Sequence, residues 1–279
     1  MWGRGPTDAT TSAAVLALAA LVTGGGSSAC SQTTNRQAFP GACSPFSVIS
    51  SVPADGADQI PTDARLSLGF SDFPDPETVS LDTVLLSSGV QTRLGGLQVD
   101  LITRSIGFQI RNLLSPDLTY LVTVLSGVRS LEGCPVKVDQ RKFHTGGGPT
   151  DPPPPPPPIP SLTSDVLPLF AARCGGSLCH RQPAEQGGGC LTAPAKGLSL
   201  CDSEAWGALV GAASTEVDGM RRVVPGDASR SFLMRKIIPG GPAGGPVPTT
   251  PGHRDPPDGP LGDTELRLIS DWIDAGAAR

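Results

Sequence analysis

The sequence predicts a multidomain protein with an all-β sandwich first, a proline-rich linker next and an all-α domain at the C-terminus. Three observations predict this order: short segments of alternating apolar and polar residues within 45–147, a run of prolines within 148–160, and apolar residues at helical spacing within 161–279. The chain has 35 glycines and 30 prolines in 279 residues, so long loops are expected between the elements.

The N-terminus, residues 1–29, has the pattern of a signal peptide. Arg4 precedes the apolar segment "AAVLALAALV" (13–22), which is too short to span a bilayer. The sequence "SSAC", ending in Cys30, resembles the lipobox of bacterial lipoproteins, although Ser27 stands where leucine is usual. Two outcomes stay open: lipid attachment at Cys30, or cleavage nearby that leaves Cys30 as a thiol. Both imply export to the periplasm, outer membrane or cell surface, with residues 30–44 as a tether.

The segment 45–147 predicts an antiparallel β-sandwich. Its expected strands share alternating apolar residues and are bounded by Gly, Pro, Asp and Ser: 65–70, 83–88, 97–102, 105–110 and 119–128.

Particular residues relate this segment to a known family. A Pro-x-Asp-Gly turn (53–56), a strand ending at Phe70, the Tyr120-x-Val-x-Val strand and a closing "KFHTGG" follow one another in the chain. In this order they resemble the bacterial Ig-like domain of S-layer and other surface proteins. The resemblance implies a spacer or adhesive module, with His144 of the closing strand as a surface residue.

The linker, residues 148–160, contains seven consecutive prolines. Such a run favours an extended polyproline II conformation, with a rise of roughly 3.1 Å per residue. We expect a rod that holds the two domains about 30 Å apart.

The C-terminal domain, residues 161–279, is expected to contain four short helices. They lie in "TSDVLPLFAARC" with a cap at Ser164 or Asp165, "DSEAWGALVGAAS", "DASRSFLMRKII" and "GDTELRLISDWIDAGA", which Gly276 would end. Four short helices make a thin core, so a cofactor or disulfides would have to complete it.

The first of these helices runs into "RCGGSLCHR", in which Cys174, Cys179 and His180 approximate the haem-attachment pattern Cys-x-x-Cys-His. The loop between the cysteines has four residues instead of two, and Gly175 and Gly176 are permissive enough for the longer loop. Together with "KGLSL", "VVPGDASRSFLMRKI" and the final "LGDTELRLISDWIDAGA", these residues resemble an exported bacterial cytochrome c-like domain.

That resemblance implies a haem c bound through thioethers at Cys174 and Cys179, with His180 as the proximal iron ligand. The methionine that the family usually supplies as sixth ligand is missing from the loop before the last helix. His253 is the candidate distal ligand there. The alternatives are a solvated His253, or a five-coordinate iron. Met234 fits a core position better than a ligand position, and Met220 lies in a loop of unknown geometry.

The other cysteines predict disulfides, because an oxidising compartment allows thiols to pair. Of seven cysteines, we expect Cys43 to pair with Cys134 and Cys190 with Cys201. Two alternatives to haem stay open. One is a Cys174–Cys179 disulfide, and the other is a zinc site made by Cys174, Cys179, His180 and one cysteine of the last pair.

The leading functional prediction is an exported, membrane-anchored electron carrier with one haem c and an unidentified redox partner protein. We expect no enzyme, because neither a Ser-His-Asp set nor a carboxylate pair is visible. The net charge of −5, without basic runs, argues against nucleic acid as a partner. The alternative is a surface binding or structural module without haem, whose cytochrome-like scaffold is stapled by disulfides.

Overall fold

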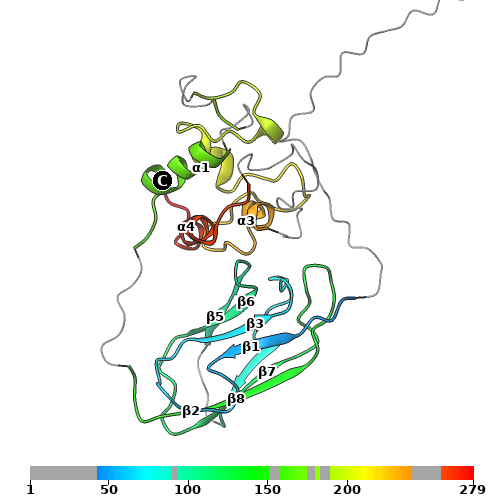
Figure 1. Ribbon diagram of the computed structural model, residues 1–279, viewed down its shortest axis with the longest axis vertical. Coiled ribbons are helices and arrows are strands. Elements are labelled where there is room, and N and C mark those ends of the chain that lie inside the picture. The colour runs from blue at the N-terminus through cyan, green and yellow to red at the C-terminus, as the bar shows by residue number, and fades with distance from the viewer. Residues whose placement is uncertain (1–42, 90–93, 151–157, 175–179, 183–188, 240–258) are drawn as a thin grey trace, which may run out of the picture.

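The computed structural model describes residues 43–89, 94–150, 158–174, 180–182, 189–239 and 259–279. The strands are β1 (Val48–Val52), β2 (Ala57–Ile60), β3 (Leu66–Phe70), β4 (Val84–Ser87), β5 (Leu94–Asp100), β6 (Ser105–Ile110), β7 (Thr119–Val124) and β8 (Asp139–Thr145). The helices are η2 (Leu162–Val166), α1 (Leu167–Cys174), η5 (Ala195–Gly197), α2 (Ala205–Leu209), α3 (Phe232–Ile237) and α4 (Asp263–Asp274). Figure 1 shows the strands in one body and the helices in another.

The strands form two four-stranded sheets that pack face to face. One sheet has the order β1-β3-β6-β5 and the other β2-β8-β7-β4. Alternate side chains point into the space between them, as the pleat requires: β3 buries Leu66, Leu68 and Phe70. Opposite them, Tyr120 of β7 stacks on Phe143 of β8 with ring centroids 5.4 Å apart. The predicted sandwich is confirmed.

The expectation of a purely antiparallel sandwich is wrong at one pair, because β2 lies parallel to β8. The turn before β2 explains this pairing. The backbone N–H of Gly56, at φ +75°, donates to the carbonyl of Lys142, and the N–H of Lys142 donates to the Asp55 carboxylate. The Asp-Gly turn therefore ties the start of β2 to the middle of β8.

The C-terminal region contains fewer helical residues than the sequence predicts. The helix expected over 202–214 ends at Leu209, because Gly211 adopts φ +72° and Val210 forms a bridge to Val223. The helix expected over 227–238 is limited to α3. A cytochrome c-like all-α fold therefore stays a prediction for this region, which consists largely of loops around short helices.

The helices nevertheless share one core. Trp272 and Ile273 of α4 are fully buried, as are Val166 of η2 and Leu209 of α2. Helix α4 ends as expected at glycine: Gly276 adopts φ +104°, and the N–H of Ala277 donates to the carbonyl of Trp272. The indole N–H of Trp272 donates to the carbonyl of Ala278, so the chain end closes over the core.

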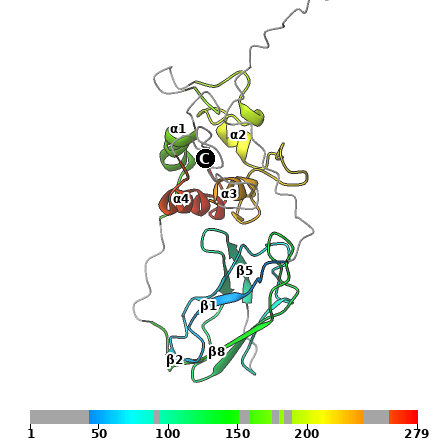
Figure 2. The same ribbon diagram turned by 45° about the vertical axis from the view of Figure 1, so that its right-hand side comes forward.

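The two bodies touch, so the expected separation of about 30 Å is wrong. Arg230, which precedes α3, pairs with Glu77 of the sandwich at 2.7 Å, and Arg267 of α4 pairs with Asp100 at the end of β5 at 2.7 Å. Figures 1 and 2 show α3 and α4 next to the sandwich in both views. Charged side chains on both sides hold the two bodies in contact.

Candidate functional site

Helix α1 carries Cys174 at its last position. The helical segment starts at η2, where the Ser161 hydroxyl accepts from the N–H of Ser164, and the Asp165 carboxylate accepts from the N–H of Ser161. The expected cap at Ser164 or Asp165 thus lies at Ser161. The Ser164 hydroxyl also donates to the Asp165 carboxylate at 2.7 Å, and this hydrogen bond, followed by the one from the Ser161 N–H, lowers the pKa of Asp165. Cys174 is half-buried at the other end of the segment.

Arg173 fixes the direction in which α1 ends. Its guanidinium donates to the carbonyls of Gly259 and Pro260 at 3.2 and 3.0 Å, and lies 3.3 Å from the Glu265 carboxylate of α4. The start of α4 and the end of α1 are therefore held side by side. Cys174, the next residue, has its position set by this contact.

His180 is held by the segment Leu198–Leu200. The N–H of Leu200 donates to the carbonyl of His180 at 2.9 Å, and Nδ1 of the His180 ring lies 2.9 Å from the carbonyl oxygen of Leu198. The neighbouring Arg181 is 9% exposed and lies 3.2 Å from the Asp202 carboxylate. The backbone and the imidazole ring of His180 are therefore both hydrogen-bonded to this one segment.

The hydrogen bond from the ring defines the chemistry that His180 offers. A carbonyl oxygen only accepts, so Nδ1 carries the proton and donates it. In the neutral ring Nε2 then carries the lone pair, which is the form that ligates a metal ion. Metal-ligating histidines almost always donate their other N–H in this way, frequently to a backbone carbonyl. Leu198 was missed by the sequence analysis, since a backbone carbonyl leaves no signal in the residue type.

The other cysteines that the structure describes are paired in two disulfides. Cys43 is joined to Cys134, and Cys190 to Cys201, the two pairs that the sequence analysis expected. The alternative zinc site with one cysteine of the second pair cannot form while that disulfide is intact, because both thiols are used. The Glu204 carboxylate lies within 4.8 Å of both Cys190 and Cys201 sulfur atoms. Cys190 and Cys201 could bind a metal with it only as reduced thiols.

Three predicted site residues, Cys30, Cys179 and His253, lie outside the described residues. Of the two methionines weighed as ligands, Met234 is 1% exposed in the core on α3. The sulfur of Met220 lies 3.8 Å from the guanidinium of Arg235. Both positions agree with structural roles for these side chains.

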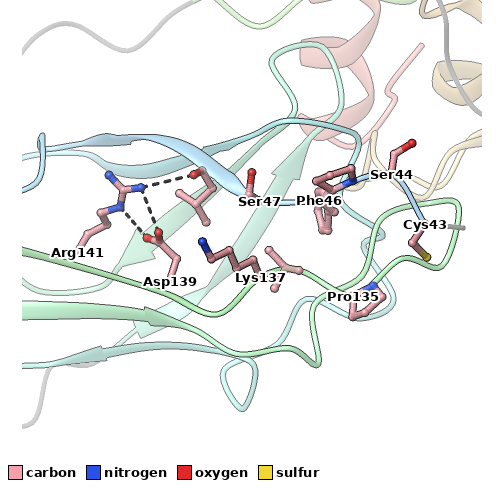
Figure 3. A pocket seen from close by; sticks show the side chains of 11 residues that line it. Cys43, Ser44, Phe46, Ser47, Pro135, Lys137, Asp139 and Arg141 are labelled. Carbon is pink, nitrogen blue, oxygen red and sulfur yellow. Dashed lines mark hydrogen bonds and ion pairs between the residues drawn. The ribbon is translucent and has the colours of Figure 1, made fainter.

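The sandwich has a pocket of its own between the chain before β1 and the start of β8 (Figure 3). Arg141 lies in it, paired with Asp139 at 2.6 Å and donating to the carbonyl of Val48 at 3.5 Å. Its hydrogen bond to Asp139 raises the pKa of Arg141. Among the residues that line this pocket Asp139 has the single carboxylate, and it is paired with Arg141.

The comparisons with known proteins concern the sandwich. Residues 43–145 match the family described as "Bacterial Ig-like domain". This part of the chain is therefore a bacterial Ig-like domain, as the resemblance of its motifs implied. The match ends at the last residue of β8, before the linker.

Solved structures are similar to part of the chain. The N-terminal part of the bacterial S-layer protein SbsC is 17% identical, covering 37% of this chain and 24% of its own, with a TM-score of 0.30. PcoC, a methionine-rich copper resistance protein from Escherichia coli, is 19% identical over 37% of this chain and 99% of its own, with a TM-score of 0.29. L,D-transpeptidase 1 from Mycobacterium tuberculosis is 17% identical, over 36% and 38%, with a TM-score of 0.26.

This chain thus spans about a quarter of the SbsC fragment that it resembles. No curated protein matches the chain. No helix in the described part of the chain combines the length and the apolar character needed to cross a bilayer.

Proposed function

We propose that this protein is an exported electron carrier whose C-terminal domain binds one haem c through Cys174 and Cys179, with His180 on the iron. The observation that carries the proposal is the hydrogen bond between Nδ1 of His180 and the carbonyl of Leu198. It orients the ring and leaves the Nε2 lone pair as the metal ligand.

Further contacts around Cys174 and His180 support the proposed haem site. Cys174 is presented at the end of a helix whose exit is fixed by Arg173, and His180 follows six residues later in the chain. The Cys190–Cys201 disulfide lies next to Leu200, whose N–H binds the backbone of His180. When bound, a haem c would supply one-electron chemistry at its iron. The residues of this chain would hold it, orient the imidazole and limit the access of water.

The Ig-like domain fits the role of a spacer or adhesive module outside the cytoplasm. Similar domains occur in the S-layer protein SbsC, and two disulfides suit an oxidising compartment. We propose that the chain is attached to a membrane through lipid on Cys30, and that it exchanges electrons with a redox protein.

A second candidate function is a surface module without haem. The observation in its favour is the core of the helical domain, in which the surrounding protein leaves Phe170, Ile269 and Trp272 no more than 1% exposed. In that case Cys174 and Cys179 would form a disulfide, and the domain would act through its surface.

Expression with the c-type maturation machinery separates the two candidates. The carrier should show a Soret band that survives acid–acetone extraction and a protein mass raised by one haem. The Cys174→Ser/Cys179→Ser variant should lose the attached haem, and His180→Gln should keep it while losing the low-spin spectrum. Protein without added mass, in which peptide mapping finds Cys174 bonded to Cys179, would establish the surface module instead.

The anchor is tested separately from the haem. Cys30→Ser should release the chain from the membrane fraction or block its processing, whether or not haem is attached. Soluble wild-type protein that begins after residue 30 would contradict lipid attachment.

A further inference from the structure

The Leu198 carbonyl that binds His180 follows a tight turn. Residues 195–198 form a turn in which the N–H of Leu198 donates to the carbonyl of Ala195 at 3.0 Å. Lys196 and Gly197 adopt φ +51° and +63°, as a type I′ turn requires. Lysine disfavours this conformation because its Cβ crowds the backbone, so contacts from outside the turn must stabilise it.

Arg222 supplies these contacts from a distant part of the chain. Its guanidinium donates to the carbonyls of Lys196 at 2.8 Å and Gly197 at 3.2 Å, and to that of Ala208 at the end of α2 at 2.9 Å. The hydroxyl of Thr215 adds a second donor to the Lys196 carbonyl at 3.1 Å. One side chain thus joins the turn to α2.

Arg222 is itself held firmly. It is 9% exposed, its N–H donates to the carbonyl of Ala212, and its carbonyl accepts from the N–H of Leu233 in α3. Burial lowers the pKa of its guanidinium, while the Glu216 carboxylate acts in the opposite direction. An arginine in such a place is costly to desolvate, and its hydrogen bonds to the three carbonyls offset that cost.

We propose that Arg222 is a positioning residue for His180: by holding the turn at Lys196 and Gly197 it places the Leu198 carbonyl that keeps the proton of the imidazole on Nδ1. This inference rests on the proposed function for the identity of the metal group that Nε2 would bind. Its central claim, the control of the His180 tautomer, is a property of the chain without haem.

The test is the tautomer of His180 in the full chain without haem, measured by nitrogen-15 NMR at a pH where the ring is neutral and assigned with His180→Gln. The wild-type ring should be mainly Nδ1-protonated. Arg222→Gln and Arg222→Lys should each shift the ratio of the tautomers toward Nε2–H by about fivefold or more, the effect of losing one ordinary hydrogen bond.

A matched control is Arg221→Gln, which removes the neighbouring, exposed arginine and its contact with the Gly211 carbonyl, and should leave the ratio unchanged. Thr215→Val, a milder change, should shift the ratio in the same direction by less, and it carries the test if both Arg222 variants unfold. An unchanged ratio in every folded variant would overturn the inference, whatever the haem content.

The haem experiment fails independently of this one. If the matured protein carries no added haem mass but its His180 tautomer depends on Arg222, the proposed electron carrier is overturned and the positioning role is retained. In haem-loaded protein, Arg222→Lys keeps the positive charge but lacks the planar guanidinium. The hydrogen bond from Nδ1 of His180 should therefore weaken, and the part of the haem spectrum that is sensitive to the imidazole should change. Arg221→Gln should leave that spectrum unchanged.

Discussion

Nε of Arg230 lies 2.7 Å from a carboxylate oxygen of Glu77, although the two residues are 153 positions apart in the chain. The same guanidinium donates to the carbonyl of Pro76 at 3.1 Å and pairs with Asp227, which orients it toward the sandwich. Together with Arg267 and Asp100, it joins the helical domain to the Ig-like domain.

The first prediction concerns this contact. Exposed ion pairs contribute about 0.5 kcal/mol each and are screened by salt, so the variant Arg230→Gln/Arg267→Gln should release the two domains. Small-angle scattering should then give a larger radius of gyration than for wild type, and high salt should enlarge the wild-type radius. Arg221→Gln serves as the control, and equal radii for the double variant and wild type would contradict the contact.

The second prediction concerns Asp274, whose pKa is raised to about 6, chiefly by burial and also by the charges of Asp227, Asp271 and Asp100. The N–H of Ala228, which donates to this carboxylate at 2.8 Å, acts in the opposite direction. Because the pKa is higher in the folded than in the unfolded chain, the stability linked to the protonated group is present below about pH 4. It is lost as the pH rises through about 6.

Asp274→Asn keeps the acceptor for Ala228 and removes the charge. We expect it to raise the free energy of unfolding above pH 6 by about 1–2 kcal/mol, after discounting for the solvent that screens part of the side chain, and to add little at pH 4. Urea unfolding at several pH values measures this difference. Asp82→Asn, an exposed carboxylate in the sandwich, should stay close to wild type throughout; a gain for Asp274→Asn that does not depend on pH would refute the assignment.

The third prediction compares the two disulfides. Cys43–Cys134 spans 91 residues and Cys190–Cys201 spans 11. In the chain-entropy account, replacing the first pair should lower the free energy of unfolding by about 4–5 kcal/mol and the second by about 3 kcal/mol. Thermal unfolding of the two double variants tests this order. The long-range bond should be the one whose loss unfolds the Ig-like domain, and the reverse ranking would argue against it.

The fourth prediction concerns Trp272, which is fully buried on α4 and donates to the carbonyl of Ala278. Trp272→Phe keeps an aromatic ring but removes side-chain volume and that hydrogen bond. It should lower the free energy of unfolding by about 2–3 kcal/mol. Calorimetry should show the loss in the unfolding of the helical domain. Trp206→Phe is the comparison, because its indole also donates to a carbonyl but is only half-buried, so its effect should be smaller.

Much of the sandwich was predicted from the sequence alone, because the alternation of apolar and polar residues that marks a strand is a local pattern. Alternation in "RLSLGF" and "TYLVTV" marks strands that have one buried face, and both lie where they were expected. Strand β1, with the sequence "VISSV", was missed, since this edge strand buries only Val48 fully and shows no alternation. The parallel β2–β8 pair depends on a contact between residues far apart, which no local pattern contains.

In the helical domain the sequence determined the residue types at the candidate site, namely the cysteines and His180, and the glycine at which α4 ends. Only the tertiary structure decided which atom of the imidazole carries the proton, because that depends on a backbone carbonyl at Leu198. It also decided that Arg222 holds the adjacent turn and that Arg230 reaches Glu77. Hydrogen bonds and ion pairs have ranges of a few ångströms, so they form only after folding brings distant segments together.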